Sequence, residues 1–362
     1  MIYHEYGTTG IKLSAIGFGG MRFERIGETE TCVEMMVEAA KGGINYFDTA
    51  PKYFGTKSEE VFGEGLAELR RRGLPYYLST KTDESEETSI RRELEGQLVR
   101  LRVDHVDFYH VWCITSLENW QLRKRNGILD TFRRLKEEGL ISHICVSSHL
   151  IGDEIRELLL EGVFEGVLFG YSAYNHSTRF KAFEAIRRHH QGAVVMNPLG
   201  GGLIPRNPAL FEALRTQENE TIVEAALRFL IAHEAITTSL VGFANLDHVR
   251  EALRAAEGYR TLSDETIEEI KQGLTRSFDG ICTGCGYCVE DCPAELPIPQ
   301  LMDAYNQKLL YGREEAIRER LSWHWSISPD EAARCTECGS CESACTQHLD
   351  IIERMASISR QR

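Results

Sequence analysis

The sequence predicts an α/β fold, namely a closed (β/α)8 TIM barrel followed by a smaller, mainly helical domain. The chain has 362 residues, 42% of them hydrophobic, which is enough to bury a large core. Within the first 257 residues, eight short β-prone runs alternate with eight segments of helical period, as a barrel of parallel strands requires. Beyond residue 257 this alternation stops, and eight of the eleven cysteines lie there.

Each predicted strand is a short apolar run that ends in polar residues or glycine. The eight runs cover residues 15–19, 44–48, 76–80, 107–112, 141–147, 166–171, 193–196 and 239–243. The predicted helices carry apolar residues at helical spacing, and they cover residues 29–41, 58–71, 88–102, 127–138, 152–161, 178–190, 220–233 and 247–256. A Gly-Thr-Thr-Gly turn predicts a hairpin over residues 2–13, outside the barrel.

Two long loops are expected at the mouth of the barrel, over residues 113–126 and 199–219. An open doubly wound sheet is the alternative fold, but the glycines of residues 17–20 do not form the GxGxxG pattern that such folds use. We therefore expect a barrel over residues 1–257, a linker helix over 258–278 and a separate domain over 279–362.

Charge and hydropathy exclude several classes of partner. The net charge is −14, from 41 basic and 55 acidic side chains, which disfavours binding to nucleic acid or to an anionic membrane surface. No apolar run reaches the length of about 18 to 20 residues that a membrane span needs, and the N-terminus lacks the pattern of a signal peptide. These features predict a cytoplasmic protein that acts on a small molecule.

The cysteines of the last domain form two runs, each with the spacing CxxCxxCxxxC. Three thiolates at this spacing bind one iron–sulfur cubane, and the fourth binds the partner cluster. This predicts a ferredoxin-like domain with two [4Fe-4S] clusters. The first cluster is assigned to Cys282, Cys285, Cys288 and Cys345, and the second to Cys335, Cys338, Cys341 and Cys292. A zinc site is the alternative, but it would leave half of the cysteines without a role.

Two helical segments, over residues 299–310 and 314–323, are expected between the cysteine runs. Trp323, His324 and Trp325 precede the second run, and we expect them to pack in the domain core. The alternative is that these aromatic residues shield the clusters or carry electrons to or from them. The remaining thiols, Cys32, Cys113 and Cys145, are expected not to bind metal.

Two motifs at the ends of barrel strands carry the predicted chemistry. Residues 45–53 read NYFDTAPKY, and residues 78–81 read LSTK. With these motifs the barrel resembles the aldo-keto reductase superfamily, in the branch with a C-terminal ferredoxin-type domain. The resemblance implies that Tyr53 is the acid, that Lys81 assists it and that Asp48 holds Lys81. A structural Asp–Lys pair beside a surface tyrosine is the alternative.

The fourth catalytic position departs from that family. The family has histidine at the end of the fourth strand, and Trp112 holds this register here. His110 lies on the same face, about 6.5 Å deeper, and could take the role if a bulge raised it. His149, at the end of the fifth strand, is a second candidate, and a hydrogen-bonded interior residue is the alternative reading of His110.

The resemblance also implies a nicotinamide cofactor, NADP(H) or NAD(H). The expected cofactor-binding residues come from loops at the strand ends: Gly20, Met21, Ser147, Ser148, Tyr171, Met196, Pro198, Leu199, Gly242, Phe243, Asn245 and His248. The helix after residue 245 is expected to meet the phosphates with its N-terminus. His248 and Arg250 are the basic residues that we expect nearby.

These features together predict an oxidoreductase that reduces a carbonyl or oxidises an alcohol, with clusters that transfer electrons or stabilise the fold. A hydride carries two electrons and a cluster accepts one, so direct exchange between them is disfavoured. A ferredoxin-linked reductase that draws electrons from the clusters, or a nucleotide-binding redox sensor without turnover, is the alternative. A redox protein is a possible partner of the clusters.

Overall fold

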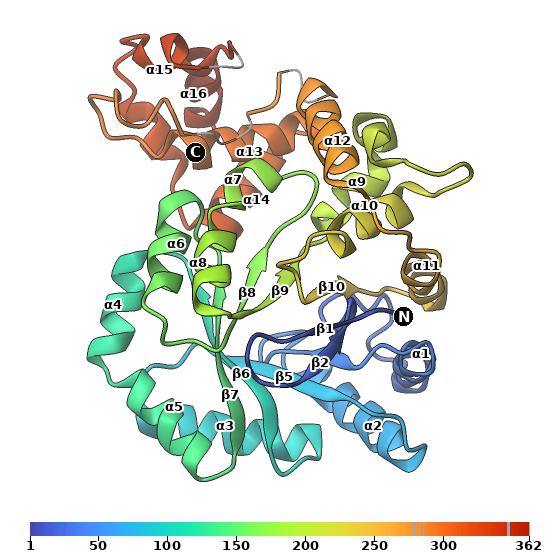
Figure 1. Cartoon of the computed structure of the whole chain (residues 1–362). Helices are drawn as coiled ribbons and strands as arrows, with labels where there is room; N and C mark the ends of the chain where they lie inside the picture. The colour runs from blue at the N-terminus through green and yellow to red at the C-terminus, as the bar shows by residue number, and fades with distance from the viewer. Residues whose placement is uncertain (278–279, 283, 285, 346–347, 362) are drawn as a thin grey trace.

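The protein folds as an eight-stranded parallel barrel that carries a helical domain over one end (Figure 1). The computed structural model describes residues 1–277, 280–282, 284, 286–345 and 348–361. The barrel closes in the order β10, β3, β4, β5, β6, β7, β8, β9. Its strands are β3 Ile16–Gly19, β4 Tyr46–Asp48, β5 Tyr77–Thr82, β6 Val106–Ile114, β7 Ile141–Ser148, β8 Gly166–Gly170, β9 Gly192–Met196 and β10 Thr238–Gly242. The predicted barrel and its eight strands are confirmed.

An antiparallel hairpin lies outside the barrel, as predicted, and is formed by β1 Tyr3–Glu5 and β2 Lys12–Ser14. Tyr6, in its turn, is fully buried against the barrel interior, with its hydroxyl 3.3 Å from the sulfur of Cys145. Gly166 and Gly192 leave room for the ring, since a Cβ on either would lie within 2.4 Å of a Tyr6 atom.

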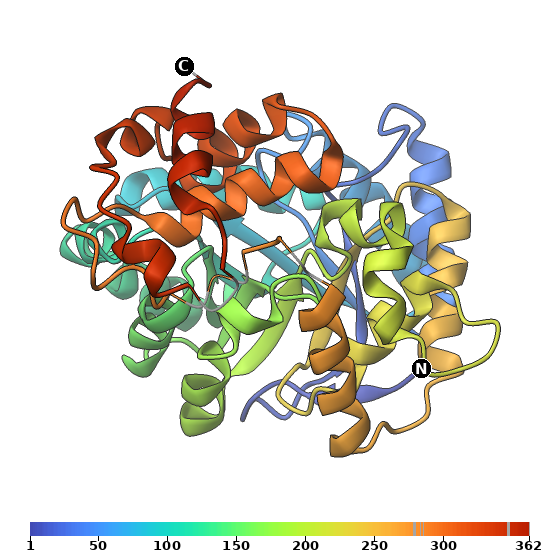
Figure 2. The ribbon, with the colours of Figure 1, turned by 90° about the horizontal axis from the view of Figure 1, so that it is seen from above.

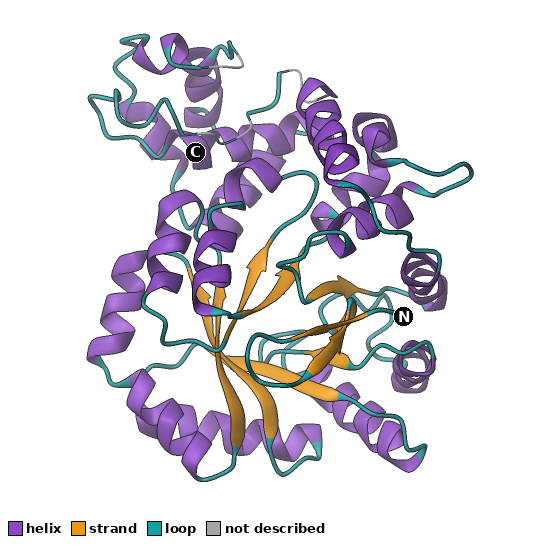
Figure 3. Cartoon of the chain, in the orientation of Figure 1, coloured by secondary structure: helices purple, strands orange, loops and turns teal. Residues whose placement is uncertain are grey.

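Helices surround the strands on the outside of the barrel (Figure 3). They are α1 Thr29–Lys41, α2 Lys57–Arg71, α3 Glu87–Leu101, α4 Leu117–Arg125, α5 Ile128–Glu137, α6 Gly152–Leu160, α7 His176–Arg179, α8 Ala182–His189, α9 Leu203–Arg206, α10 Ile222–Ile231 and α11 Leu246–Glu257. Their apolar faces pack with the strands in one large core, and a second, smaller cluster that includes Tyr46, Phe108 and Leu168 lies among the strands.

Three predictions for the barrel need correction. Residues 113–126 are not a loop, because β6 continues to Ile114 and α4 follows, with Ser116 accepting a hydrogen bond from the N–H of Asn119. The predicted helix over residues 178–190 is split into α7 and α8. The segment 199–219 contains α9 and two 3₁₀ helices, η1 Gly200–Gly202 and η2 Pro208–Leu214, with Phe211 and Leu214 buried.

After the barrel, α12 Asp264–Ser277 packs on the same core through Ile270 and Leu274. The C-terminal region follows and has a separate apolar core. Its elements are α13 Ile298–Tyr311, α14 Glu315–Arg320, the π-helical turn η3 Leu321–Trp325, the 3₁₀ helix η4 Pro329–Arg334, α15 Ser340–Ser343 and α16 Ile351–Ser359. Seen from above, these helices lie over part of the barrel (Figure 2).

The aromatic residues before the second cysteine run do not share one environment. Trp323 is 90% exposed, so its predicted place in the domain core is wrong. Trp325 packs against the core of the C-terminal domain, as predicted. His324 instead packs edge-on against His149 of the loop after β7. Within the described ranges, no helix is both long enough and apolar enough to cross a membrane.

Candidate active site and cluster sites

Asp48 and Lys81 form an ion pair inside the mouth of the barrel. Asp48 ends β4, and Lys81 lies near the end of the neighbouring β5. The Nζ atom of Lys81 lies 2.7 and 2.8 Å from the two carboxylate oxygens, and the Ser79 hydroxyl donates to Oδ2 at 2.7 Å. Both side chains are buried, so their charges attract strongly and require each other.

Tyr53 lies in the loop between β4 and α2, and Lys81 Nζ is 5.5 Å from the centre of its ring. Burial raises the pKa of Tyr53 above its ordinary value, and this effect exceeds the lowering by the Lys81 charge. Burial alone would lower the pKa of Lys81, but Asp48 and Tyr53 hold it above its ordinary value. At neutral pH, Tyr53 is therefore protonated and Lys81 beside it is charged.

Glu59, in the first turn of α2, supports this corner of the barrel. It is fully buried, accepts from the Thr80 hydroxyl at 3.0 Å and pairs with Arg100 of α3 at 2.7 Å. Gln97 of α3 donates to the Lys81 carbonyl at 2.9 Å. These contacts fix the backbone on both sides of Lys81, so the ammonium group is held in place.

Trp112, and not a histidine, contacts Tyr53. The two rings meet edge to face, with centroids 6.0 Å apart. His110 is level with Lys81 in the β5–β6 register, and the irregularity between β6 and β7 begins after it, at Val111. The bulge therefore does not raise His110 toward Tyr53.

His110 is fully buried in the barrel, as the alternative reading of an interior residue expects. Its ring has no well-formed hydrogen bond among the described residues, and its polar neighbour is the backbone of Val146. Burial and the nearby Lys81 charge lower its pKa to about 3, so the ring is neutral at physiological pH. A neutral imidazole beside the Lys81–Tyr53 pair can influence it through its dipole and not through a charge.

His149 faces the C-terminal domain. Its ring lies 4.9 Å from that of His324, and burial together with Arg179 lowers its pKa to about 3. Arg179 ends α7, is 2% exposed, and donates to the carbonyl of Leu150 and to Nε2 of His324. The contacts of His324 with His149 and Arg179 were not predicted from the sequence, where the Trp-His-Trp segment was the one available signal.

The residues expected to hold nicotinamide lie at neighbouring strand ends. Ser147 and Ser148 end β7 and are buried, and the Ser148 hydroxyl lies 3.3 Å from the Ile114 carbonyl. Tyr171 follows β8 and packs edge-on against Phe183. Met196 ends β9, and its carbonyl accepts from the N–H of Tyr171.

The segment after β9 turns sharply, and Asn197 adopts a positive φ of 55° just before Pro198 and Leu199. At the end of β3, Gly20 is required by close packing, because a Cβ there would lie 2.6 Å from Phe62 and from Ser58. Met21 beside it is 50% exposed. Gly20 is therefore packed from within the protein, and the exposed Met21 is the side chain that an extended ligand could meet at this strand end.

The loop after β10 leads into α11 and carries the expected phosphate site. Asn245 caps the helix by accepting from the N–H of His248 at 3.1 Å, and Phe243 is buried against Phe18. A capped helix of 12 residues presents free backbone N–H groups and a positive dipole end to an anion. This arrangement fits a dinucleotide phosphate.

The expectation that His248 and Arg250 are the nearby basic residues is incomplete. Arg22, three residues after β3, packs its side chain over Gly242, where a Cβ would lie 2.4 Å from it. Arg250 is instead engaged by Asp247 and Glu38, at 3.4 and 3.8 Å. Arg22 could not be predicted from the sequence, because 220 positions separate it from Gly242 and only closure of the barrel brings the two together.

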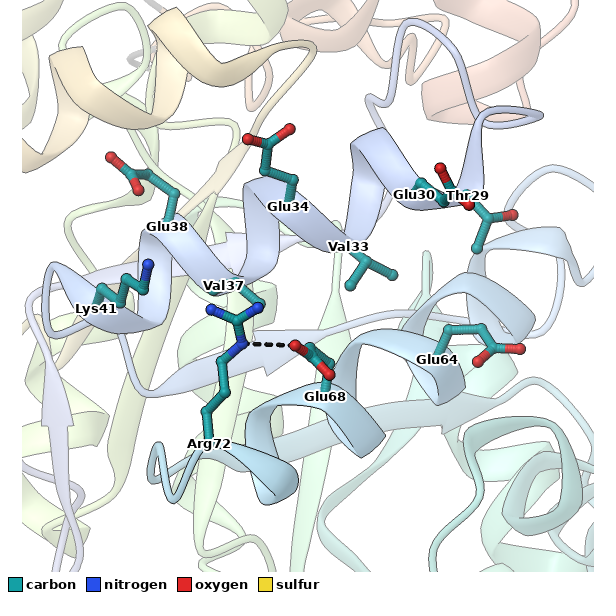
Figure 4. A pocket seen from close by; sticks show the side chains of 10 residues that line it. All are labelled: Thr29, Glu30, Val33, Glu34, Val37, Glu38, Lys41, Glu64, Glu68 and Arg72. Carbon is teal, nitrogen blue, oxygen red and sulfur yellow. Dashed lines mark hydrogen bonds and ion pairs between the residues drawn. The ribbon is translucent and has the colours of Figure 1, made fainter.

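An open groove lies elsewhere, between α1 and α2 on the outside of the barrel (Figure 4). Five glutamates line it, one of which, Glu68, pairs with Arg72 at 2.6 Å. The groove shares no residue with the Asp48–Lys81 site, and we assign it no part in the chemistry.

Four cysteines of the C-terminal domain line one small hollow: Cys292, Cys335, Cys338 and Cys341. They are the four assigned from the spacing to the second cluster. The rest of the lining is mostly apolar and includes Leu296, Ile298 and Met355, so the thiols face a space that suits an inorganic cluster. The N–H and hydroxyl groups of Ser340 lower the pKa of Cys338, which favours the thiolate.

Of the four cysteines assigned to the first cluster, Cys285 lies outside the described residues. Cys282 and Cys345 pack against the same apolar core in which Cys288 is buried. The N–H of Gly284 points at the sulfur of Cys282, at 3.4 Å, as backbone donors do around cluster sulfurs. The described cysteines form no disulfide, and their chemistry fits iron–sulfur ligation.

Comparison with known proteins identifies both parts of the chain. Residues 15–274 match the model of the aldo/keto reductase family, and residues 281–349 match that of the 4Fe-4S dicluster domain. With the barrel and the polar cluster at its strand ends, these matches define a class of oxidoreductase in which a barrel is joined to an iron–sulfur domain. The chain belongs to the aldo/keto reductase family.

Several relatives resemble the barrel part. L-galactose dehydrogenase of Arabidopsis thaliana is 28% identical over 297 residues, which are 73% of this chain and 92% of that protein. The NADH-specific methylglyoxal reductase of Escherichia coli is 27% identical over 55% of this chain and 67% of its own. An aldo-keto reductase of Bacillus halodurans has the same fold, with a TM-score of 0.66 and 24% identity over 75% of this chain and 96% of that one.

Proposed function

We propose that this protein is an NAD(P)H-dependent reductase of small carbonyl compounds, or an NAD(P)⁺-dependent dehydrogenase of the corresponding alcohols, with iron–sulfur clusters in its C-terminal domain. The buried Asp48–Lys81 pair beside Tyr53 carries the proposal, since Lys81 Nζ lies 2.7 Å from the carboxylate. A purely structural ion pair would not need a tyrosine within 5.5 Å of its ammonium group at the catalytic face of a barrel.

In this proposal Tyr53 donates its hydroxyl proton to the carbonyl oxygen as negative charge develops there. Lys81 stabilises the phenolate that remains, and Asp48 keeps Lys81 charged and correctly placed. When bound, the reduced nicotinamide supplies the hydride. Trp112 forms an apolar wall beside Tyr53, and the neutral His110, level with Lys81, is the fourth member of the proposed site.

The direct test is anaerobic oxidation of NADH and NADPH with a panel of aldehydes, ketones and keto acids. Turnover that depends on both the carbonyl compound and Tyr53 supports the proposal. Nucleotide binding without turnover by any of the compounds, in fully cluster-loaded protein, contradicts it and favours a sensor. The presence of Trp112 at the usual histidine register is the observation that favours that second candidate.

We further propose that the nicotinamide lies against Ser147, Ser148, Tyr171 and Met196, and that the phosphates lie near Gly242 and the N-terminus of α11. NADPH is bound by an aldo-keto reductase of Klebsiella pneumoniae that shares this fold, with a TM-score of 0.63 and 18% identity over 75% of this chain and 95% of that one. Gly20, Met21, Pro198, Leu199, Phe243, Asn245 and His248 complete the proposed pocket. The choice between NADP(H) and NAD(H) depends on the basic residues beside it.

Arg22→Ala is expected to weaken nucleotide binding by about 10- to 100-fold, because it removes a charged donor worth roughly 1.5–3 kcal/mol. The loss is expected to be larger for NADPH than for NADH if Arg22 meets the extra phosphate. Isothermal titration with both nucleotides measures it. Arg25→Ala, which removes an exposed arginine paired with Glu28, is the matched control and leaves both affinities unchanged; equal affinities for Arg22→Ala and wild type would refute the assignment.

Cys288→Ser is expected to remove one cluster, the one assigned to Cys282, Cys285, Cys288 and Cys345. Iron per chain then falls from about eight to about four, because the second set of thiols is intact. Iron and sulfide analysis of anaerobically purified protein measures this, and Cys32→Ser, which changes a buried thiol of α1, is the control. Loss of all iron would show that the clusters do not form independently.

We also propose the division into a barrel over residues 1–257, a linker helix over 258–278 and a cluster domain over 279–362. A cytoplasmic location remains a prediction from the sequence. A ferredoxin-linked reductase, in which a redox protein supplies electrons through the clusters, is favoured by contacts between the cluster domain and the barrel mouth, such as the one between His324 and His149.

A further inference from the structure

One tyrosine of the barrel and one helix of the cluster domain share a saturated hydrogen-bond network. Tyr174 lies in the loop between β8 and α7, and its hydroxyl lies 3.2 Å from Oδ1 of Asp303 in α13. The same hydroxyl accepts from the amides of Asn306, at 3.4 Å, and Gln307, at 3.2 Å. A hydroxyl has one donor and two acceptor sites, so all three are used at this contact.

Asn306 continues this network to a cluster ligand. Its Oδ1 accepts from the N–H of Cys282 at 2.9 Å, and its Nδ2 donates to the Cys282 carbonyl at 2.8 Å. The side chain is 1% exposed, so water does not compete for these bonds. Because the Asn306 carboxamide binds both the N–H and the carbonyl of Cys282, it fixes the backbone of Cys282 and restricts where the cysteine sulfur can lie.

Asp303 keeps α13 seated on the barrel. Besides the Tyr174 hydroxyl, its carboxylate accepts from Nε of Arg320 at 2.6 Å and from the indole N–H of Trp325 at 2.8 Å. The donors from α14 and η3 fix α13 within its own domain, and the Tyr174 hydroxyl is the donor from the barrel. A displacement of Tyr174 reaches Asn306 directly, through the hydrogen bond between them.

The second set of cysteines has no such connection. Among the described residues, no hydrogen bond joins Cys335, Cys338 or Cys341 to a barrel residue, and Cys338 is exposed. Helix α15, which carries Cys341, contacts α16, and α16 contacts α13. In Figure 1, α13 lies between the barrel and the upper helices α15 and α16.

We propose that Asn306 is a positioning residue that places the cluster of the Cys282 run beside the barrel mouth, as the inner of two clusters. The cluster of Cys292, Cys335, Cys338 and Cys341 is the outer one. We propose in addition that a nucleotide bound in the barrel shifts the reduction potential of the inner cluster through Tyr174 and Asn306. This second part rests on the proposed nucleotide site, and the first part does not.

The physical basis of the second part is the short loop that carries Tyr174. Tyr171, proposed to contact nicotinamide, precedes it by three residues, and the N–H of Ser172 is tied to Oδ1 of Asn175 at 2.8 Å. This bond closes the turn that contains Tyr174, and the linkage requires that a ligand which moves Tyr171 moves this turn with it. Linkage then requires the reciprocal effect: nucleotide affinity changes when the inner cluster is reduced, and a tenfold change corresponds to about 59 mV for a one-electron couple.

The test is a redox titration of the anaerobically purified holoprotein, followed by electron paramagnetic resonance. Cys288→Ser identifies which signal belongs to the inner cluster. Asn306→Ala is expected to shift the potential of that signal alone. The matched control is Ser340→Ala, which removes a hydroxyl 3.6 Å from the Cys338 sulfur and is expected to shift the other signal alone.

A shift of both signals, of neither, or of the outer signal in Asn306→Ala overturns the placement. If that variant fails to load its inner cluster, Asn306→Asp, which keeps the acceptor for the Cys282 N–H, takes its place. If Asn306→Asp is also iron-deficient at the inner cluster while the outer signal is unchanged, the positioning role is supported by that selective loss.

The linkage is tested by adding NADP⁺ to the wild type and to Tyr174→Phe during the same titration. A shift of the inner signal in the wild type, reduced in Tyr174→Phe, is expected. NADP⁺ that binds with no shift of the inner signal overturns the linkage. If NADP⁺ does not bind, the titration is repeated with NAD⁺. Failure of both nucleotides to bind overturns the proposed nucleotide site and the linkage, while the placement still stands or falls with Asn306→Ala.

Discussion

Tyr53→Phe is expected to lower kcat/KM for NAD(P)H-dependent carbonyl reduction by about 10²- to 10⁴-fold, because the proton donor is removed. Nucleotide binding is expected to persist, since the ring and its contact with Trp112 remain. Steady-state kinetics on an active carbonyl compound, with a separate titration of nucleotide affinity, measure the two effects. Because burial raises the pKa of Tyr53, the wild-type hydroxyl keeps its proton at neutral pH, and the rate is expected to fall only in strongly alkaline solution.

The matched control is Tyr3→Phe, which removes an exposed hydroxyl that donates to the Gly43 carbonyl at 2.9 Å. This variant is expected to keep full activity. Turnover retained within a few-fold in Tyr53→Phe would assign the proton to another donor.

Asp48→Asn is expected to lower the free energy of unfolding of the barrel by about 3–5 kcal/mol, because it leaves the buried Lys81 without its counter-charge. The substitution nearly conserves volume, so the effect reports the charge and not a cavity. Urea unfolding followed by circular dichroism measures it. Asp130→Asn, in an exposed pair with Arg133, is the control and is expected to cost less than about 1 kcal/mol.

The double variant Asp48→Asn, Lys81→Met separates the charge effect from local packing. Removing both charges is expected to restore much of the lost stability, because no uncompensated charge then remains buried. A double variant no more stable than Asp48→Asn would mean that the carboxylate acts through Ser79 and the strand end instead. Both variants are expected to lack activity, whatever their stability.

The barrel was predictable because each strand has a recognisable local sequence pattern. The run at residues 141–147, for example, is apolar, β-branched and bounded by Gly139 and the polar end at Ser148, and it becomes β7 Ile141–Ser148. The helix α4 was missed because its apolar face is narrow. Trp120 is its one fully buried apolar residue, and its start depends on the Ser116 cap, which a loop could equally contain.

Contacts between distant segments were the part that the sequence could not predict. The spacing of the cysteines was sufficient to associate Cys292 with the second run, because cluster geometry restricts the pairing. No comparable rule connects Tyr174 with Asn306, or Arg22 with Gly242, since each contact depends on how complete domains and strands come together. The same holds for His149, whose position at a strand end was evident but whose neighbour, His324, belongs to the other domain.

The burial of Tyr6 against the barrel interior restricts the order in which the molecule can fold during synthesis. Among the first residues to leave the ribosome, Tyr6 must wait for Cys145, Gly166 and Gly192 before its ring and hydroxyl are enclosed. The end of the barrel that Tyr6 covers therefore closes late. In a nascent chain that ends before β9, the Tyr6 ring stays exposed because Gly192 is not yet present. Such long-range closure slows folding and makes incomplete chains natural clients for chaperones.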